Sequence, residues 1–203
     1  MKPAMLWLPL ILLRPTQITV GLIYVAVKID IMRRMEDGAR KRFMEKHAIK
    51  CARAADGSLH IVDHHHWARA WHDCGIEKVP VEIVAHLPTD CSNGIRAALA
   101  ERSWLHPYDE FGRRRDASEL PVTVGLMRDD PYQSLAALTR RAGAYRKAHA
   151  TCSSFIWTDF IRGAVQLEGS DTVAFTSALL ASIKAARSDA ARALPGFIGN
   201  RDQ

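Results

Sequence analysis

The residues best suited to chemistry are Asp63, His64, His65 and His66, four polar side chains in a row. Residues 59–63 have strand character and a helical pattern follows them, so the four residues stand at a strand-to-helix junction. The first-turn amides of a helix lack intrahelical acceptors and lie at the positive end of its dipole, which favours phosphate binding. Imidazoles also exchange protons near neutral pH. The sequence therefore predicts a phosphate site here, with His65 or His66 as proton shuttle or charge stabiliser and Asp63 as helix cap.

Two basic residues outside this run could reach the same anion. Arg69 follows one to two turns later and could give a bidentate phosphate contact, and Lys28 follows the first apolar segments. Successive helix positions are rotated by about 100°, so three consecutive histidines cannot all face one ligand. At least one of the three is therefore expected to be structural or solvated.

Metal binding is the second interpretation of the same segment, because five histidine and cysteine residues fall within eleven positions. A helix-borne metal site needs ligands at i and i+3 or i+4, whereas His66 and His72 are six positions apart. His65 and His72 share a helix face but lie two turns apart, too far for one ion. We expect no metal site and favour anion binding.

The composition is that of a globular protein. The chain has 203 residues, 48% of them hydrophobic and 25% charged, and a formal net charge of +6, which permits a polyanionic partner such as DNA. The N-terminal apolar run of residues 1–13 contains Pro9 and is shorter than the roughly 18 residues of a membrane span. We expect no membrane segment. Four widely spaced cysteines indicate buried free thiols and a cytoplasmic location, namely Cys51, Cys74, Cys91 and Cys152.

Hydrophobic periodicity predicts an α+β unit in the first part of the chain. Residues 20–31 are apolar at both the strand and the helix period, so their type stays open. An Asp-Gly pair at residues 56–57 predicts a hairpin. The expected elements are strands 8–13, 49–53, 59–63 and 79–85, a helix over 32–47 broken at Gly38, and a helix from Asp63 to Gly75.

The second part of the chain has a helical pattern. Asp130 followed by Pro131 predicts a capped helix, Ser153 or Ser154 can cap the next helix, and Asp171 a third. We expect two domains, an α+β domain over residues 1–87 and a helical extension over 88–203 packed on it.

Several segments carry a resemblance to a known family. Asp-His-His-His at 63–66 resembles the phosphate-binding motif of the ParB/sulfiredoxin-like superfamily. Leu-Arg-Pro-Thr-Gln at 13–17 resembles the opening of its bacterial ParB-like nuclease subgroup. Further segments that resemble this subgroup lie at residues 104–109, 129–136, 157–160 and 194–196. The resemblance implies a small mixed sheet with short helices and a C-terminal helical extension. It also implies binding of a nucleoside triphosphate or diphosphate with Mg²⁺, or of a phosphorylated small molecule, by His64, Arg69, Lys28 and Gln17, with nuclease or phosphotransferase activity.

The sequence departs from three branches of that superfamily. There is no cysteine beside Asp63, which speaks against sulfinic acid reduction, and no basic recognition helix, which speaks against sequence-specific DNA binding. His66 stands where the free serine kinases, the nearest in chemistry, have arginine. Two alternatives stay open: a non-catalytic DNA-binding or chromosome-partition-associated protein, and a scaffold in which the histidines only pack.

Overall fold

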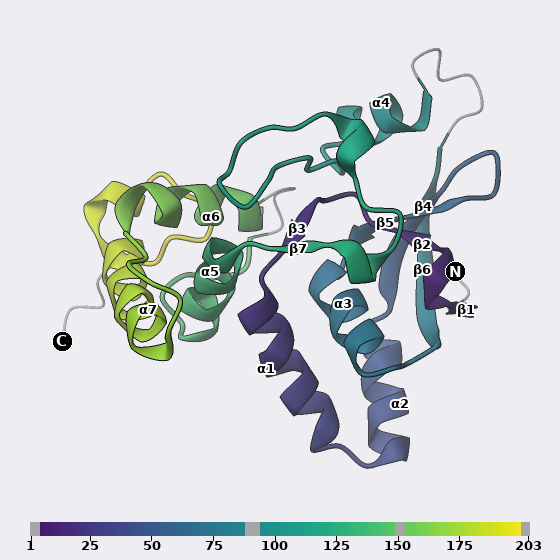
Figure 1. Cartoon of the computed structure of the whole chain (residues 1–203), viewed down its shortest axis with the longest axis horizontal. Coiled ribbons are helices and arrows are strands. Elements are labelled where there is room, and N and C mark those ends of the chain that lie inside the picture. The colour runs from purple at the N-terminus through teal and green to yellow at the C-terminus, as the bar shows by residue number, and fades with distance from the viewer. Residues whose placement is uncertain (1–4, 88–93, 149–152, 200–203) are drawn as a thin grey trace. The chain divides into compact units, whose positions relative to one another are not determined.

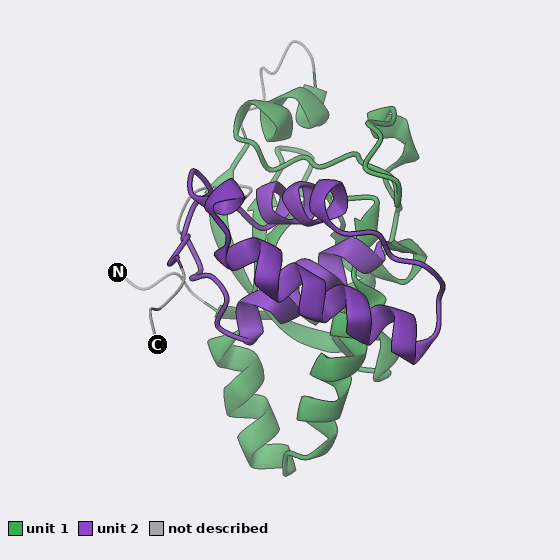
Figure 2. Ribbon diagram, turned by 90° about the vertical axis from the view of Figure 1, so that its left-hand side faces the viewer, with its two compact units in different colours: residues 1–129 green, residues 130–203 purple. Residues whose placement is uncertain are grey.

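The computed structural model describes residues 5–87, 94–148 and 153–199. The chain divides into two compact units, unit 1 over Met1–Asp129 and unit 2 over Asp130–Gln203 (Figure 2). The sequence placed a boundary at residue 87, which lies inside unit 1. The reason is that Ala98 and Leu99, which come after that point, bury their side chains against the same sheet as the earlier residues.

The strands are short and the helices make up most of the regular structure (Figure 1). The strands are β1 Met5–Pro9, β2 Leu13–Arg14, β3 Thr19–Val20, β4 Ile49–Arg53, β5 Leu59–Asp63, β6 Lys78–His86 and β7 Arg128–Asp129. The helices are α1 Leu22–Arg33, α2 Asp37–Lys46, α3 His65–Asp73, α4 Gly94–Glu101, α5 Pro131–Arg141, α6 Ser153–Ala164 and α7 Thr172–Arg187. Short 3-10 turns are η1 Leu10–Leu12, η2 Ala117–Glu119, η3 Val124–Leu126 and η4 Asp189–Ala191.

Unit 1 is built on a mixed sheet of order β1-β6-β4-β5-β2. The β1–β6 and β4–β5 pairs are antiparallel, while β4–β6 and β2–β5 are parallel. The β4–β5 hairpin has the bounds expected from the sequence, and Gly57 has a φ of 83° in its turn, a conformation that favours glycine. The expected α+β fold class with a small mixed sheet is confirmed.

Two layers of side chains cover the sheet of unit 1. On one face, the strands pack against α1, α2 and α3, with Trp71 and Ile61 fully buried among them. On the other face, Leu99 of α4 packs with Ala52 of β4 and Leu87. Because both faces of the sheet are buried, the position of β5 is fixed. The position of Asp63, the last residue of β5, is fixed with it.

Residues 20–31, whose type the sequence left open, are mostly helical, because Tyr24, Val25, Lys28 and Met32 form one buried stripe at helical spacing. Two local expectations were wrong in detail. The break in the charged segment falls before Asp37 and not at Gly38, which sits in the first turn of α2 where a glycine is tolerated. The 3-10 turn η1 divides the expected first strand into β1 and β2.

Unit 2 is a packing of α5, α6 and α7. Trp157 of α6 is buried and stacks on Tyr145 with ring centroids 3.8 Å apart. Asp130 accepts a hydrogen bond from Tyr132 N at 3.0 Å, and Asp171 accepts one from Ala174 N at 2.8 Å, so the caps predicted at these two residues are confirmed. Ser153 and Ser154 lie inside α6, so neither precedes the helix as its cap.

Two of the four cysteines, Cys51 and Cys74, lie in the described part of the chain, and both are free thiols. Cys51 is buried in β4 as a free thiol, whereas Cys74 is only half-buried, because it ends α3 instead of lying on its buried face. The other two cysteines, Cys91 and Cys152, lie outside the described residues.

No helix in the described parts of the chain is long and apolar enough to cross a membrane.

Candidate functional site

His64 is the residue in which β5 ends and α3 begins. It has a φ of 73°, in the left-handed region that a non-glycine residue adopts only at a cost. Its Nδ1 donates to the carbonyl oxygens of Ala48 at 2.8 Å and His47 at 3.1 Å, and its amide donates to Asp63 Oδ1 at 2.7 Å. These contacts hold the strained conformation in place.

Asp63 does not cap α3, contrary to expectation. The residue at the N-cap position is His64, whose side chain makes no capping hydrogen bond to the helix. The left-handed turn directs the Asp63 carboxylate to the His64 amide, so it does not reach the amides of the helix. Because Nδ1 of His64 carries a hydrogen, Nε2 is the nitrogen that can gain a proton, and it lies 3.9 Å from Asp63 Oδ2.

His65 is buried and fixed to a distant segment. Its Nε2 accepts a hydrogen bond from the Thr16 amide at 3.2 Å, while the Thr16 hydroxyl donates to Ile61 O at 2.6 Å. Burial lowers the pKa of His65 to about 4. A ring that stays neutral near pH 7 is poorly suited to shuttle protons there, so the geometry favours a positioning role for His65.

His66 connects the first turns of two helices. Its half-buried ring accepts a hydrogen bond at Nε2 from the Gly21 amide at 3.3 Å, just before α1, and lies edge-on to Tyr24 with centroids 5.3 Å apart. In the next residue, the Leu22 amide donates to Asp129 Oδ1 at 2.8 Å. The starts of α1 and α3 therefore lie together, and a carboxylate of the chain already binds at one of them.

Lys28 reaches the same neighbourhood through the aromatic rings. Its Nζ lies 3.5 Å from the Trp67 ring centroid and 4.7 Å from that of Tyr24, and the side chain is buried. Such cation–π contacts are attractive, because the negative face of an aromatic ring favours a nearby ammonium group. Since Tyr24 contacts both Lys28 and His66, the structure brings together these two residues, which the sequence separates widely.

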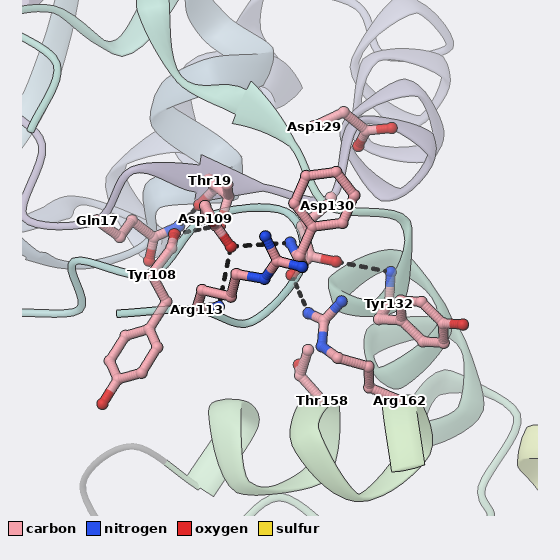
Figure 3. A network of polar contacts seen from close by, with 12 residues as sticks. Gln17, Thr19, Tyr108, Asp109, Arg113, Asp129, Asp130, Tyr132, Thr158 and Arg162 are labelled. Carbon is pink, nitrogen blue, oxygen red and sulfur yellow. Dashed lines mark hydrogen bonds and ion pairs between the residues drawn. The ribbon is translucent and has the colours of Figure 1, made fainter. Parts of the chain in front are cut away.

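Arg69 and Gln17 are engaged elsewhere. Arg69 Nε donates to both carboxylate oxygens of Asp73 at 2.9 and 3.0 Å, and Nη1 donates to Met127 O at 2.7 Å. Asp73 is the last residue of α3, so the guanidinium is held toward the end of the helix and not its start. Gln17 is buried and donates from Nε2 to Thr19 O at 2.6 Å (Figure 3).

Sequence reasoning missed the partners that hold the three histidines. Thr16 and Gly21 lie 49 and 45 residues from the histidines they bind, and the Ala48 carbonyl 16 residues from His64. Thr16 belongs to the Leu-Arg-Pro-Thr-Gln segment at 13–17, which carries part of the family resemblance, but the resemblance gave Thr16 itself no role. Periodicity carries no information on such partners because they belong to other elements.

Two places in the chain have adjacent acidic residues, Asp109-Glu110 and Asp129-Asp130, and their carboxylates have partners within the protein. Asp109 accepts hydrogen bonds from the amides of Phe111 and Arg113 at 3.0 and 2.9 Å in a turn of unit 1 (Figure 3). In unit 2, Asp130 pairs with Arg162 at 2.7 Å. The described residues contain no group of three histidine, cysteine or acidic side chains arranged to hold a metal ion.

Known proteins similar to this chain share the segment that contains the three histidines. A family model described as "Putative ParB-like nuclease" matches residues 7–163, which include all three histidines and their partners. A crystal structure of a protein from Agrobacterium tumefaciens is similar, with 31% sequence identity and a TM-score of 0.84 over 97% of this chain and 99% of that one. No curated protein matches the chain.

Proposed function

The chain belongs to the ParB-like nuclease family, and from that premise we propose that it binds a nucleotide or another phosphorylated ligand at the start of α3. The observation that carries the proposal is the left-handed His64, a strained residue held by three hydrogen bonds directly before the helix. Backbone strain of this kind concentrates at functional sites, because elsewhere a glycine would remove its cost.

The electrostatics of the junction suit a phosphate. The α3 dipole places positive charge at the His65 amide, for which helix geometry supplies no intrahelical acceptor. The Lys28 ammonium adds a full charge nearby through its contacts with Trp67 and Tyr24. In this proposal Asp63, whose side chain is about half exposed, would hold the Mg²⁺ of a bound nucleoside triphosphate or diphosphate.

The proposed reaction class is phosphoryl transfer or phosphodiester cleavage. In either case an imidazole takes the proton of the attacking hydroxyl or water as its oxygen forms a new bond to phosphorus. The phosphorus–oxygen bond to the leaving group breaks, and that oxygen departs with the electron pair, as a nucleoside diphosphate in transfer or as a sugar oxygen that takes a proton from water in cleavage. The His65 amide and Lys28 stabilise charge on the phosphoryl oxygens. His64 Nε2 is the preferred base, because Nδ1 is already a donor and Asp63 lies beside the nitrogen that would gain the proton. His65 positions the junction through Thr16.

Calorimetric titration with ATP, CTP and ADP in the presence of Mg²⁺ tests the proposal. We expect at least one nucleotide to bind the wild type and to bind His66→Gln about tenfold more weakly, because the ring accepts from Gly21 at Nε2 and its Nδ1–H donor beside the helix start is lost. Glutamine can still accept from the Gly21 amide, so the fold is preserved. His72→Gln, at the far end of α3, is the matched control. Negligible heats in the wild type, or equal heats in all three proteins, would refute nucleotide binding.

A non-catalytic DNA-binding role is the second candidate, favoured by one loop of unit 1. Arg113, Arg114 and Arg115 are exposed, and the Arg113 guanidinium lies 5.3 Å from the ring centroid of Phe111, which is 65% exposed. Basic groups beside an open aromatic ring are suited to nucleic acid.

Filter retention of a DNA duplex at increasing salt separates this candidate from the first. Each lost phosphate contact reduces the slope of log affinity against log salt by about 0.9, so Arg113→Gln/Arg114→Gln should flatten it by about two. Arg42→Gln/Lys46→Gln, on the exposed side of α2, removes the same charge as a control. Absence of retention even at about 50 mM salt would rule the candidate out.

We also propose a cytoplasmic location. The support is that Cys51 and the half-buried Cys74 are free thiols, as is usual in a reducing compartment. Cell fractionation with detection of the native protein tests this placement, and recovery in an extracytoplasmic fraction would contradict it.

A further inference from the structure

Unit 1 contains a cleft that shares no lining residue with the start of α3. Its volume is about 520 Å³, within the range of small-molecule sites. The walls come from η1, from β2 and β5 at the edge of the sheet, from α4, and from residues 120–122. Arg14 and His60 are neighbours in the β2–β5 register, and both line the cleft at the edge of the sheet.

The polar groups of this cleft are basic. Arg14, Arg96 and His60 line it, and no acidic residue is among the described residues that do. Arg14 and Arg96 are exposed, and neither guanidinium makes a hydrogen bond or ion pair with another residue in the described part of the chain. Two guanidinium groups from separate elements, both open to solvent and directed to one cleft, leave positive charge that an anion can neutralise.

His60 is oriented by a hydrogen-bonded chain from the hairpin turn. Asp56 Oδ1 accepts from the Ser58 amide at 2.9 Å and from the Ser58 hydroxyl at 2.6 Å. With its hydrogen committed to Asp56, the Ser58 oxygen can only accept at the 3.0 Å contact with His60 Nε2. The chain therefore fixes the ring and its tautomer, leaving Nδ1 as the nitrogen that gains or loses a proton. A ring so fixed is organised beforehand for a ligand.

The other lining residues are aliphatic side chains and prolines, and several stay open to solvent. Ile11 is 66% exposed, Leu12 55% and Val122 71%. Apolar groups gathered at the mouth of a basic cleft are suited to a ligand with an apolar part, because covering them removes apolar area from water. Inorganic phosphate alone would leave this surface uncovered.

We propose that this cleft is a binding site for a small amphipathic anion, whose carboxylate or phosphate head is held by Arg14 and Arg96 and whose apolar body covers Ile11, Leu12 and Val122. The site is separate from the proposed nucleotide site in both its residues and its preference for an apolar ligand. A nucleotide offers no aliphatic body for these side chains, and no phenylalanine, tyrosine or tryptophan is among the described lining residues.

Calorimetry with octyl phosphate, octanoate, octanol and inorganic phosphate tests the site. We expect the two amphipathic anions to bind, and Arg14→Gln and Arg96→Gln each to weaken them by about tenfold or more. Octanol and inorganic phosphate should each bind much more weakly than octyl phosphate, since each lacks one half of the ligand. Arg42→Gln, on α2 and outside the cleft, is the matched control and should bind like the wild type.

Three results would overturn the proposal: no binding of either amphipathic anion, octanol binding as tightly as octyl phosphate, or an unchanged affinity in Arg14→Gln/Arg96→Gln. Both arginines are exposed, so circular dichroism should show the variants folded. His66→Gln should retain octyl phosphate binding, which separates failure of this site from failure of the nucleotide site.

The pH dependence of octanoate binding provides a second readout. Burial and the neighbouring Arg14 lower the pKa of His60, with Asp56 opposing them, so the ring is neutral at pH 7 without a ligand. A carboxylate held by Arg14 and Arg96 favours the charged ring, and binding should tighten as pH falls from about 7.5 to about 5.5. His60→Gln should remove this dependence. An identical pH profile in the variant would exclude His60 from the site.

Discussion

Replacing Asp130 by alanine is expected to lower the free energy of unfolding of unit 2 by about 3–5 kcal/mol, because the change breaks a buried ion pair and removes a helix cap. Asp130 is 2% exposed, accepts from the Tyr132 amide at the start of α5, and lies 2.7 Å from the Arg162 guanidinium of α6 (Figure 3). Burial raises the pKa of the Asp130 carboxyl even beside Arg162, so desolvation outweighs their attraction. The loss therefore comes mainly from a guanidinium that lacks its buried carboxylate partner and from an uncapped helix.

Urea unfolding followed by circular dichroism measures this effect. Asp130→Asn should cost less than alanine, because asparagine retains the cap and offers Arg162 a carbonyl oxygen. Asp171→Ala is the matched control: it removes an exposed cap that has no buried ion pair, and should cost about 1 kcal/mol. If Asp130→Ala cost no more than Asp171→Ala, the ion pair would have no role in holding α5 and α6 together.

Acidification is expected to cost about 3 kcal/mol of stability through His65 alone, between pH 6.5 and about pH 4. The folded protein holds the pKa of His65 at about 4, below its ordinary value of 6.5, because the ring is buried. The unfolded chain therefore binds a proton first as the pH falls. The stabilisation is complete above pH 6.5, decreases through this window, and is exhausted below about pH 4.

His65→Gln is the variant that isolates the effect. The glutamine amide oxygen can accept from Thr16 N as the imidazole does, but it does not titrate. Unfolding free energies measured at several pH values should fall in the wild type across this window and stay nearly level in the variant. Carboxylates with lowered pKa values, such as Asp56 and Asp116, contribute at lower pH. Parallel curves for the two proteins would show that His65 is not buried as a neutral ring.

The two histidine variants also divide the roles within the junction. His65 is tied to Thr16 and shielded from solvent, whereas the rings of His64 and His66 are half-buried and lie beside the helix start. We therefore expect His65→Gln to alter stability against pH while leaving nucleotide affinity nearly unchanged, and His66→Gln to do the reverse. The helical rotation of about 100° per residue already required such a division, because it forbids three neighbours from facing one ligand.

The sequence by itself determined the elements whose causes are local. The β4–β5 hairpin follows from alternation and the Asp-Gly turn, and the starts of α5 and α7 follow from Asp130-Pro131 and Asp171. The strand-to-helix junction at the histidines was also predictable. In each case the hydrogen bonds and the hydrophobic period involve residues only a few positions apart, so a single stretch of chain carries the whole signal.

Only the tertiary structure decided what the side chains at that junction do. His65 is held by Thr16, which is 49 residues away in sequence but lies beside it in space. Arg69 is held away from the expected anion site by a hydrogen bond to the carbonyl oxygen of Met127, which is 58 residues away in sequence. The same holds for the helical state of residues 22–33, which burial against α3 selects from an apolar run without a clear period. Partners of this kind are set by how elements pack, and packing is a property of the whole core that no local pattern records.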